Sequence, residues 1–412
     1  MNFATPATWV FMTAVHSIDR ADEISLLAVL GMVVISYLAW LLGLGSQGLS
    51  MLTALLLAGA IVLMGREIAS GRWLAPLILV CLFVIAAGSP TGDWDARSIW
   101  LFHAKRIYID HSLASQLDGY ASWSHNDYPV LVPAVSASLA SLLGHWNEAV
   151  PKLAGPLVMA PALIVLARRL TFTGMAAWLV LLLFCAGKLL VNGYLDAVLG
   201  VYFVAAFALA RELRGTGDEE GGNAPPVDYR AIATACLVFV VLTLLKNEGL
   251  FALGAIVGSV IVVALSQGRR PQRHFVLVLV LAIVPILHWK WLANAQGVSN
   301  YLINSNMGSH ALARLQEPSS LLRILESMFL AWPVLLPISL SAFFAWRFRR
   351  DPRCQAAVLA VGAYSAIIFC AYLSTPMDLA WHLQTSVDRV MLPVSLLLGY
   401  EVARFAGLPR GP

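Results

Sequence analysis

Long apolar runs separated by short polar loops dominate the chain. The runs approach the roughly 20 residues that an α-helix needs to cross the hydrocarbon core of a bilayer. We expect membrane-spanning helices at about 24–44, 49–65, 73–88, 151–167, 174–190, 191–210, 230–246, 249–267, 275–293, 322–346, 355–373 and 390–406. The segment 128–144 is apolar but short, begins with Tyr-Pro and contains Pro133, so it is interpreted as an interfacial or re-entrant helix. The pattern predicts an all-α, polytopic membrane protein with about 12–13 transmembrane helices.

Composition supports this class. Of 412 residues, 59% are hydrophobic and 12% are charged, whereas a soluble domain carries roughly 25% charged residues. The net charge of +4 is spread over the loops and gives no reason to expect nucleic-acid binding. The five cysteines lie in or beside apolar runs without a CxxC pair, which argues against a disulfide framework and a zinc site.

Arginine-rich loops predict the orientation. They all fall on one side of the expected helices, which the positive-inside rule assigns to the cytoplasm together with both termini. The loops 89–128, 294–321 and 374–389 are then outside, and 215–228 is a flexible cytoplasmic linker. We expect an integral protein of the bacterial inner (plasma) membrane, with its active site on the periplasmic or extracellular face.

The first outer loop concentrates charged and aromatic residues in GDWDARSIWLFHAKRIYID. Asp93 and Asp95 have two interpretations. Either acid could cap a helix running through 96–109, or serve as a general base or metal ligand whose pKa is raised by neighbouring tryptophans. His103 and Lys105 are further candidates in the same loop.

The loop ends in HNDYPVLVP. Asn-Asp before Tyr-Pro favours a turn on its own account. Alternatively, the loop closes on itself and brings His125, Asp127 and Tyr128 toward Asp95, where they would bind substrate.

Charged residues also occupy the outer ends of later helices. Lys188 and Asp196 flank VNGYL, and Lys246 and Glu248 flank a turn in LLKNEGL. Charges at such positions are costly unless they are paired or face a hydrated cavity. Lys188 and Asp196 could pair with each other, and the Lys246–Glu248 turn could be purely structural, but both sets also fit a site for an anionic substrate or headgroup.

The last outer loop contributes His382 and Arg389. An arginine at a helix end commonly extends its guanidinium to the headgroups. The same guanidinium matches the oxygens of a phosphate or diphosphate. An anionic ligand would explain why Lys105, Lys188, Lys246 and Arg389 lie on the side that the positive-inside rule leaves poor in cations.

Taken in order, these motifs resemble the GT-C superfamily of membrane glycosyltransferases, which includes protein mannosyltransferases and the aminoarabinose transferase of lipid A. The likeness consists of an Asp-bearing first outer loop, a Tyr-Pro helix start, a second acid heading a span and an Arg-Pro late span: DWDARSIW, HNDYPVLVP, GYLDAVLGVYF and DRVMLPV. It covers about 73–406, leaving 1–72 as additional N-terminal transmembrane helices and 407–412 as a cytoplasmic tail. Those extra helices, and the absence of the frequent C-terminal soluble domain, depart from the family and leave acceptor recognition open.

The resemblance implies a polyprenyl-phosphate sugar as donor, a first-loop acid as catalytic base and an outward-facing catalytic cavity. Asp95 would be the base, with Asp93 as the competing choice. Asp196 would be the second acid, and Lys246 and Arg389 would bind phosphate. The acceptor could be a glycan, a lipid or a protein. Apart from the resemblance, the carboxylates of Asp93, Asp95 and Asp127, with His125 as a further candidate ligand, would suit magnesium or manganese as an optional metal.

Two other classes of function compete with a transferase. A polytopic transporter or lipid-linked glycan flippase would need polar residues through the membrane midplane and paired broken helices, whereas the polar residues here gather at the outer ends. A non-enzymatic subunit of a polysaccharide-assembly complex would tolerate Asp95→Asn.

Overall fold

The computed structural model describes residues 20–214, 228–269, 273–298, 306–330, 339 and 351–406. Every regular element in these ranges is helical. Six helices are long and apolar enough to cross a membrane: α2 Arg20–Leu41, α3 Ser46–Ala69, α8 with its extension Phe172–Leu190, α11 Asn247–Ser266, α12 Arg273–Ala295 and, within α16 Pro352–Ser374, Cys354–Ser374. The prediction of an all-α, polytopic membrane protein is confirmed.

The other α-helices of the described ranges are α4 Leu74–Gly88, α5 Leu101–Asp110, α6 Leu131–Leu143, α7 Ala154–Ala167, α9 Asp196–Arg214, α10 Tyr229–Leu245, α13 Met307–Leu315, α14 Pro318–Phe329, α17 Leu379–Val390 and α18 Leu392–Ala406. The expected number of spans stays a prediction, because several of these helices are short. The predicted span 322–346 is described only in part, and the predicted tail 407–412 and most of the linker 215–228 lie outside the described residues.

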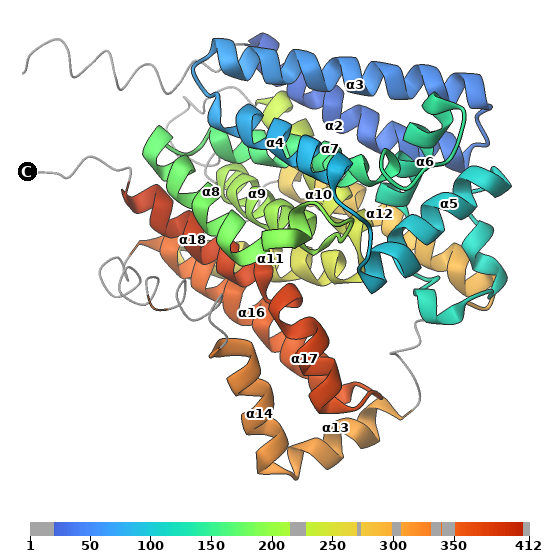
Figure 1. The fold of residues 1–412 in the computed structure, drawn as a ribbon. Helices are drawn as coiled ribbons and strands as arrows, with labels where there is room; N and C mark the ends of the chain where they lie inside the picture. Colours follow the sequence, from blue (N-terminus) through green and yellow to red (C-terminus); the bar gives the residue numbers. More distant parts are fainter. Residues whose placement is uncertain are drawn as a thin grey trace, which may run out of the picture.

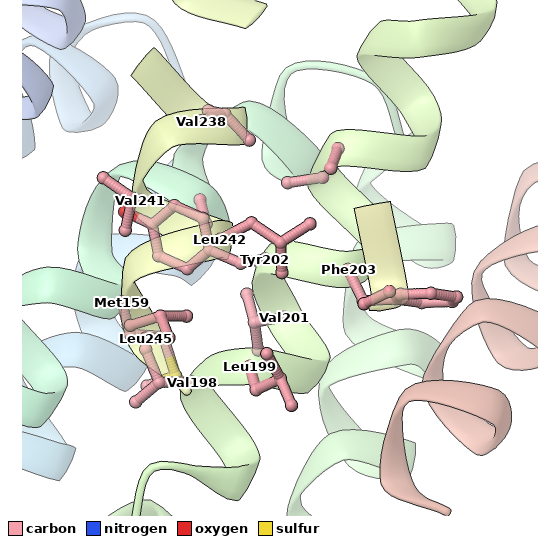
Figure 2. Close-up of a cluster of buried hydrophobic side chains, with 14 of the residues drawn as sticks. Met159, Val198, Leu199, Val201, Tyr202, Phe203, Val238, Val241, Leu242 and Leu245 are labelled. Carbon is pink, nitrogen blue, oxygen red and sulfur yellow. The ribbon is translucent and has the colours of Figure 1, made fainter. Parts of the chain in front are cut away.

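The core forms around α9, which packs against α7, α10, α11 and α18. All residues from Ala197 to Ala210 are buried. Figure 2 shows the α9 side chains Val198, Val201 and Tyr202 among residues of α7 and α10. The hydroxyl group of Tyr202 donates a hydrogen bond to the carbonyl oxygen of Val158 at 2.8 Å, so this buried polar group has a partner. An apolar helix surrounded in this way can place its first residue, Asp196, firmly at one end of the bundle.

Helix α6 is covered by protein on nearly every side. Its 13 residues span about 20 Å at 1.5 Å per residue, less than the roughly 30 Å of a hydrocarbon core. It packs against α2, α3, α5 and α7, and the chain from Asn126 to Ala140 is buried. A short helix enclosed by protein is what a re-entrant segment requires, so of the two interpretations this geometry favours the re-entrant one.

The first outer loop is itself largely helical. A π-helix over Ala96–Trp100 leads directly into α5, with the amide of Leu101 bonded to the carbonyl of Ala96. The predicted helix over 96–109 is therefore confirmed, although its first turn has the wider i→i+5 pattern. Such turns are rare and often occur at functional sites.

Helices α13, α14 and α17 extend from the bundle beside the end of α16 (Figure 1). Arg314 of α13 caps α16 by donating from its guanidinium to the carbonyls of Tyr372, Leu373, Thr375 and Met377, at 2.7–3.0 Å. A cation at a helix C-terminus satisfies the last carbonyls and complements the helix dipole. The predicted loops 294–321 and 374–389 thus contain ordered helices.

A buried group of charges closes the end of the bundle opposite to Asp196. This arginine-end cluster consists of Asp22, Glu67, Arg66, Arg72 and Arg168. Asp22 accepts from Arg66 and Arg72 at 2.9 Å, and Glu67 accepts from Arg72 and Arg168 at 2.6 Å. The bonds join α2, α3 and the residues after α3 and α7. Among the described residues, no buried polar atom of these five side chains lacks a hydrogen bond.

Candidate functional site

Three acids and two cations gather at the end of the bundle where the loop 89–128 lies. This loop-end cluster consists of Asp95, Asp196, Lys246, Glu248 and Arg389. Arg389 donates to the Asp95 carboxylate and lies 3.7 Å from Asp196 Oδ2. Lys246 Nζ lies 2.9 Å from Asp196 Oδ1 and 3.4 Å from Glu248 Oε1. Residues far apart in the sequence therefore form one continuous chain of opposite charges.

Each member is fixed by the end of a helix. Asp95 immediately precedes the π-helix, Asp196 begins α9, and Arg389 lies in the last turn of α17. Lys246 and Glu248 lie at the tight junction of α10 and α11. Gly249 permits that junction, because a Cβ there would overlap the carbonyl oxygen of Leu242.

Asp93 belongs to a neighbouring ion pair. Its carboxylate accepts from Lys188 and from Asn192, both at 2.7 Å. The turn that carries these partners contains Gly193 at φ 93°, a conformation that favours glycine. Two of the structural interpretations are wrong. The Asp95 side chain makes no capping hydrogen bond, and the Asp93 carboxylate accepts from side chains instead. Lys188 does not pair with Asp196, because Lys188 pairs with Asp93 while Asp196 pairs with Lys246.

The pKa of Asp93 departs from the expectation in direction. Hydrogen bonding from Lys188, assisted by Asn192, lowers the pKa of the Asp93 carboxyl in spite of partial burial. Trp94 is exposed and does not desolvate the acid. Asp93 is thus held in its ionised form by an exposed lysine.

Asp127 is buried beside the loop-end cluster. Its Oδ2 accepts from Asn247 at 2.8 Å and from Lys290 at 2.9 Å, and its backbone carbonyl accepts from Trp289 and Lys290. The predicted turn at this point closes the first loop against α11 and α12. Asp127 is therefore hydrogen-bonded to Asn247, the chain neighbour of Glu248, rather than lying against Asp95.

His125 and Tyr128 form an aromatic wall at the same place. Their rings lie 4.6 Å apart, and Tyr128 also contacts Trp100 at 5.6 Å. Burial lowers the pKa of His125, while the nearby carboxylates of Glu248, Asp127 and Asp95 act in the opposite direction. His125 adopts φ 55°, an uncommon conformation for a non-glycine residue that is often found at functional sites.

Aromatic rings also flank the cations. Lys246 Nζ lies 5.9 Å from the centroid of Trp100, and the Arg389 guanidinium lies 4.8 Å from that of Tyr194. Cation–π contact holds these side chains without neutralising them. Of the two interpretations of Arg389, extension to the headgroups does not fit the structure, since the guanidinium faces the carboxylates of Asp95 and Asp196.

The remaining candidates, His382, His103 and Lys105, differ in how deeply their side chains are buried. His382 donates or accepts at Thr375 Oγ1, 2.9 Å away, and burial, with Arg314 and Arg389 adding to it, lowers its pKa to about 4. His103 is fully buried against Ser124 at 3.2 Å, and burial lowers its pKa to about 4 as well. Lys105 is exposed on α5. His103 and Lys105 are therefore not part of the loop-end cluster.

The three acids proposed for a magnesium or manganese site do not converge. Asp93 pairs with Lys188, Asp95 with Arg389 and Asp127 with Lys290. Within the described ranges, no group of three or more His, Cys, Asp or Glu is arranged to hold a metal ion. The ion pairs thus give no support to a single metal site made by these three acids, and a metal stays a prediction.

Sequence reasoning did not single out Lys290, Asn192 or Tyr194. The signal for Lys290 was present, because this lysine stands between Trp289 and Trp291 at the outer end of an expected span. Asn192 and Tyr194 carry no such signal, since either residue is ordinary in a turn.

Comparison with protein-family models, with curated proteins and with solved structures gave no match. The likeness to GT-C glycosyltransferases therefore depends on the four sequence motifs alone.

Proposed function

We propose that the protein is a membrane glycosyltransferase that moves a sugar from a polyprenyl-phosphate donor to an acceptor hydroxyl. The observation that carries the proposal is the Asp95–Arg389 pair, set beside the buried Asp196–Lys246 pair. A carboxylate next to fixed cations at the end of an apolar bundle combines a general base with a binding site for a lipid phosphate. The membrane-like helices provide the surroundings that an isoprenoid tail needs.

In this proposal Arg389 binds the donor phosphate. Its Nη1 donates to Asp95 and its Nε to the carbonyl of Thr385, whereas no hydrogen bond from Nη2 is found among the described residues. A guanidinium held by two of its nitrogens can offer the third to a phosphate oxygen without reorganisation. Lys246 contributes positive charge from the other side of Asp196.

Asp95 acts as the base. It takes the proton of the acceptor hydroxyl while the hydroxyl oxygen bonds to the anomeric carbon. The bond between that carbon and the phosphate oxygen breaks, and its electron pair leaves with the polyprenyl phosphate. Arg389 and Lys246 stabilise the charge that develops on this leaving group. Asp93 is the competing base, but its engagement by Lys188 and Asn192 favours a supporting role.

The proposal places the reaction on the periplasmic or extracellular face of a bacterial plasma membrane, with both termini cytoplasmic. The acceptor is a hydroxyl of a glycan, a lipid or a protein. Magnesium or manganese would enter with the substrate rather than in a site made by the acids alone.

Transfer can be tested with purified protein in lipid nanodiscs and a panel of polyprenyl-phosphate sugars. We expect wild type and Asp95→Asn to bind the same donor, and Asp95→Asn to turn it over about 10²–10⁴-fold more slowly. Asp93→Asn is the matched control and should retain turnover within about tenfold. Turnover lost in Asp93→Asn but kept in Asp95→Asn would move the base by two residues. Failure of folded wild type to bind any donor would contradict the transferase and favour a transporter or flippase.

A further inference from the structure

Hydrogen-bond acceptors without donors accumulate around the loop-end cluster. Buried oxygens with no hydrogen-bond partner among the described residues occur on four neighbouring side chains: Asp127 Oδ1, Asp196 Oδ2, Asn247 Oδ1 and Glu248 Oε2. A buried acceptor left without a donor costs about 1–3 kcal/mol. Native proteins contain few such groups, and several at one place require an explanation: strain, a catalytic role, or a bound water, ion or ligand.

The four oxygens belong to one connected group. Asn247 donates to Asp127 at 2.8 Å and is followed in the chain by Glu248. Lys246 joins Glu248 to Asp196, and the nearest Arg389 nitrogen lies 3.7 Å from Asp196 Oδ2, beyond hydrogen-bond distance. Asp127 and Asp196 are 3% and 2% exposed, so bulk water does not satisfy them.

The charge of this group argues against a second phosphate at the same oxygens. Each of the four atoms accepts hydrogen bonds, and three belong to carboxyl groups, which would repel an anion. The matching ligand must bring several donors to separate points. Hydroxyl groups on a ring meet that requirement. The rings of Trp100 and Tyr128 lie beside the group, with Trp100 between Tyr128 and Lys246, and they supply apolar surface next to the oxygens. Trp100 Nε1, itself buried without a partner, adds one donor for a ring oxygen.

We infer that Asp127, Asp196, Asn247 and Glu248 form a subsite for a polyhydroxylated ring, with Trp100 and Tyr128 as its apolar wall. The inference rests on the proposed function in that the ring is the transferred sugar, while the phosphate stays with Arg389. Sugar recognition and phosphate recognition are thereby divided between acceptor-rich and cationic parts of one site.

Isosteric amides test the subsite atom by atom. In Glu248→Gln the side chain must keep its oxygen toward Lys246, so an NH₂ donor replaces Oε2. In Asp127→Asn the oxygen must stay toward Asn247 and Lys290, so an NH₂ donor replaces Oδ1. Each change turns a free acceptor into a donor that faces the hydroxyls. Asp118→Asn, in an exposed pair with Arg106, is the matched control.

The measurement is the ratio of the Kd for polyprenyl phosphate to the Kd for polyprenyl-phosphate hexose, with full-length protein in nanodiscs. We expect wild type and Asp118→Asn to gain about tenfold or more from the hexose, and both site variants to lose most of that gain while their Kd for polyprenyl phosphate changes less than about threefold. Size-exclusion profiles and melting temperatures identify variants that have not folded. Equal loss for both ligands in folded variants would overturn the subsite.

Free methyl glycosides separate this inference from the transferase proposal. Saturation-transfer NMR on wild type, Glu248→Gln and Asp127→Asn reports ring binding without any lipid. Glycoside binding that both variants lose, in a protein that transfers no sugar, would retain the subsite and refute the transferase. Binding of Mn²⁺ alone by wild type but not by Glu248→Gln, with no glycoside signal, would overturn the subsite, because the oxygens would then serve a cation.

Discussion

The two charged clusters at opposite ends of the bundle are built from the same residue types but differ in completeness. The arginine-end cluster has three arginines and two acids, with no buried atom of its side chains unpaired among the described residues. The loop-end cluster has three acids and two cations, and it leaves Asp196 Oδ2 and Glu248 Oε2 without hydrogen bonds.

The difference indicates that the arginine-end cluster stabilises the fold, whereas the loop-end cluster can bind a ligand. Charges that satisfy one another hold helices together and have no remaining capacity to bind. Charges that leave buried acceptors are stabilised by the scaffold around them, here α9 and its apolar neighbours, and can engage a ligand. Matched substitutions at the two ends can therefore separate stability from activity.

The largest effect is expected at the arginine end. Glu67→Gln leaves Arg72 and Arg168 facing a neutral group in a fully buried position, and breaking a buried pair in this way costs about 3–5 kcal/mol of stability. Thermal and denaturant unfolding in detergent should show the loss, with turnover per folded molecule unchanged. Glu212→Gln removes a pair that is half exposed and should cost less than about 1 kcal/mol. A loss of turnover without a loss of stability in Glu67→Gln would contradict this difference between the clusters.

Arg389→Gln tests the loop end. Removal of a cation that faces the leaving group should slow transfer about 10²–10³-fold, equivalent to roughly 3–4 kcal/mol in the transition state. The melting temperature should fall little, because Asp196 keeps its pair with Lys246 and the Asp95 side chain is partly exposed to water. Arg106→Gln, on the outer face of the first loop, is the control. Equal effects of the two changes on turnover would mean that Arg389 has no special role.

Acid should destabilise the fold through His103, a buried residue of the first loop that lies outside the loop-end cluster. His103 has its pKa lowered to about 4 by burial, so between about pH 6.5 and pH 4 the unfolded chain binds a proton that the folded chain does not. Stability contributed by the neutral ring is complete above pH 6.5 and declines as the pH falls, by up to about 3 kcal/mol. Melting temperatures at pH 7.5 and 5 should differ less in His103→Gln than in wild type. His145→Gln, at an exposed position, should keep the wild-type slope; an unchanged slope in His103→Gln would refute the assignment.

Asp93→Asn should have the smallest effect. The Lys188 side chain is 72% exposed, and exposed pairs contribute about 0–1 kcal/mol. Unfolding measured at low and high salt should give nearly the same small difference from wild type. A loss of more than about 2 kcal/mol in the free energy of unfolding would show that the Asp93–Lys188 pair also stabilises the fold.

The fold was largely predictable because helix length and apolar composition are local properties. The expected span 49–65 appears as Ser46–Ala69, and 355–373 as Pro352–Ser374. The short segment at 128–144 was recognised as unusual from its length, but its enclosure by α2, α3, α5 and α7 depends on contacts that no local pattern encodes.

The residue types of the site could be predicted from the sequence, but the ion pairs that they form could not. Hydropathy indicated that Asp95, Asp196, Lys246 and Arg389 lie near helix ends on one side. Which acid meets which cation depends on how each helix is rotated, and Arg389 reaches Asp95 across 294 positions of sequence. For that reason the expected Lys188–Asp196 pair was wrong, and Lys290 was overlooked although it met the same criterion as Lys246.

Because of the π-helix over Ala96–Trp100, the direction in which the side chains of the first loop point depends on the number of residues in this turn. Each residue of an α-helix turns the chain by about 100°. Loss of one residue from this wide turn would leave an ordinary α-helix. It would also rotate Asp95 relative to Trp100 and to the buried side of α5. A variant or relative lacking that residue would keep the hydropathy and the charge of the segment while losing its alignment with Arg389. Insertions and deletions in 96–100 are therefore expected to be tolerated less than substitutions.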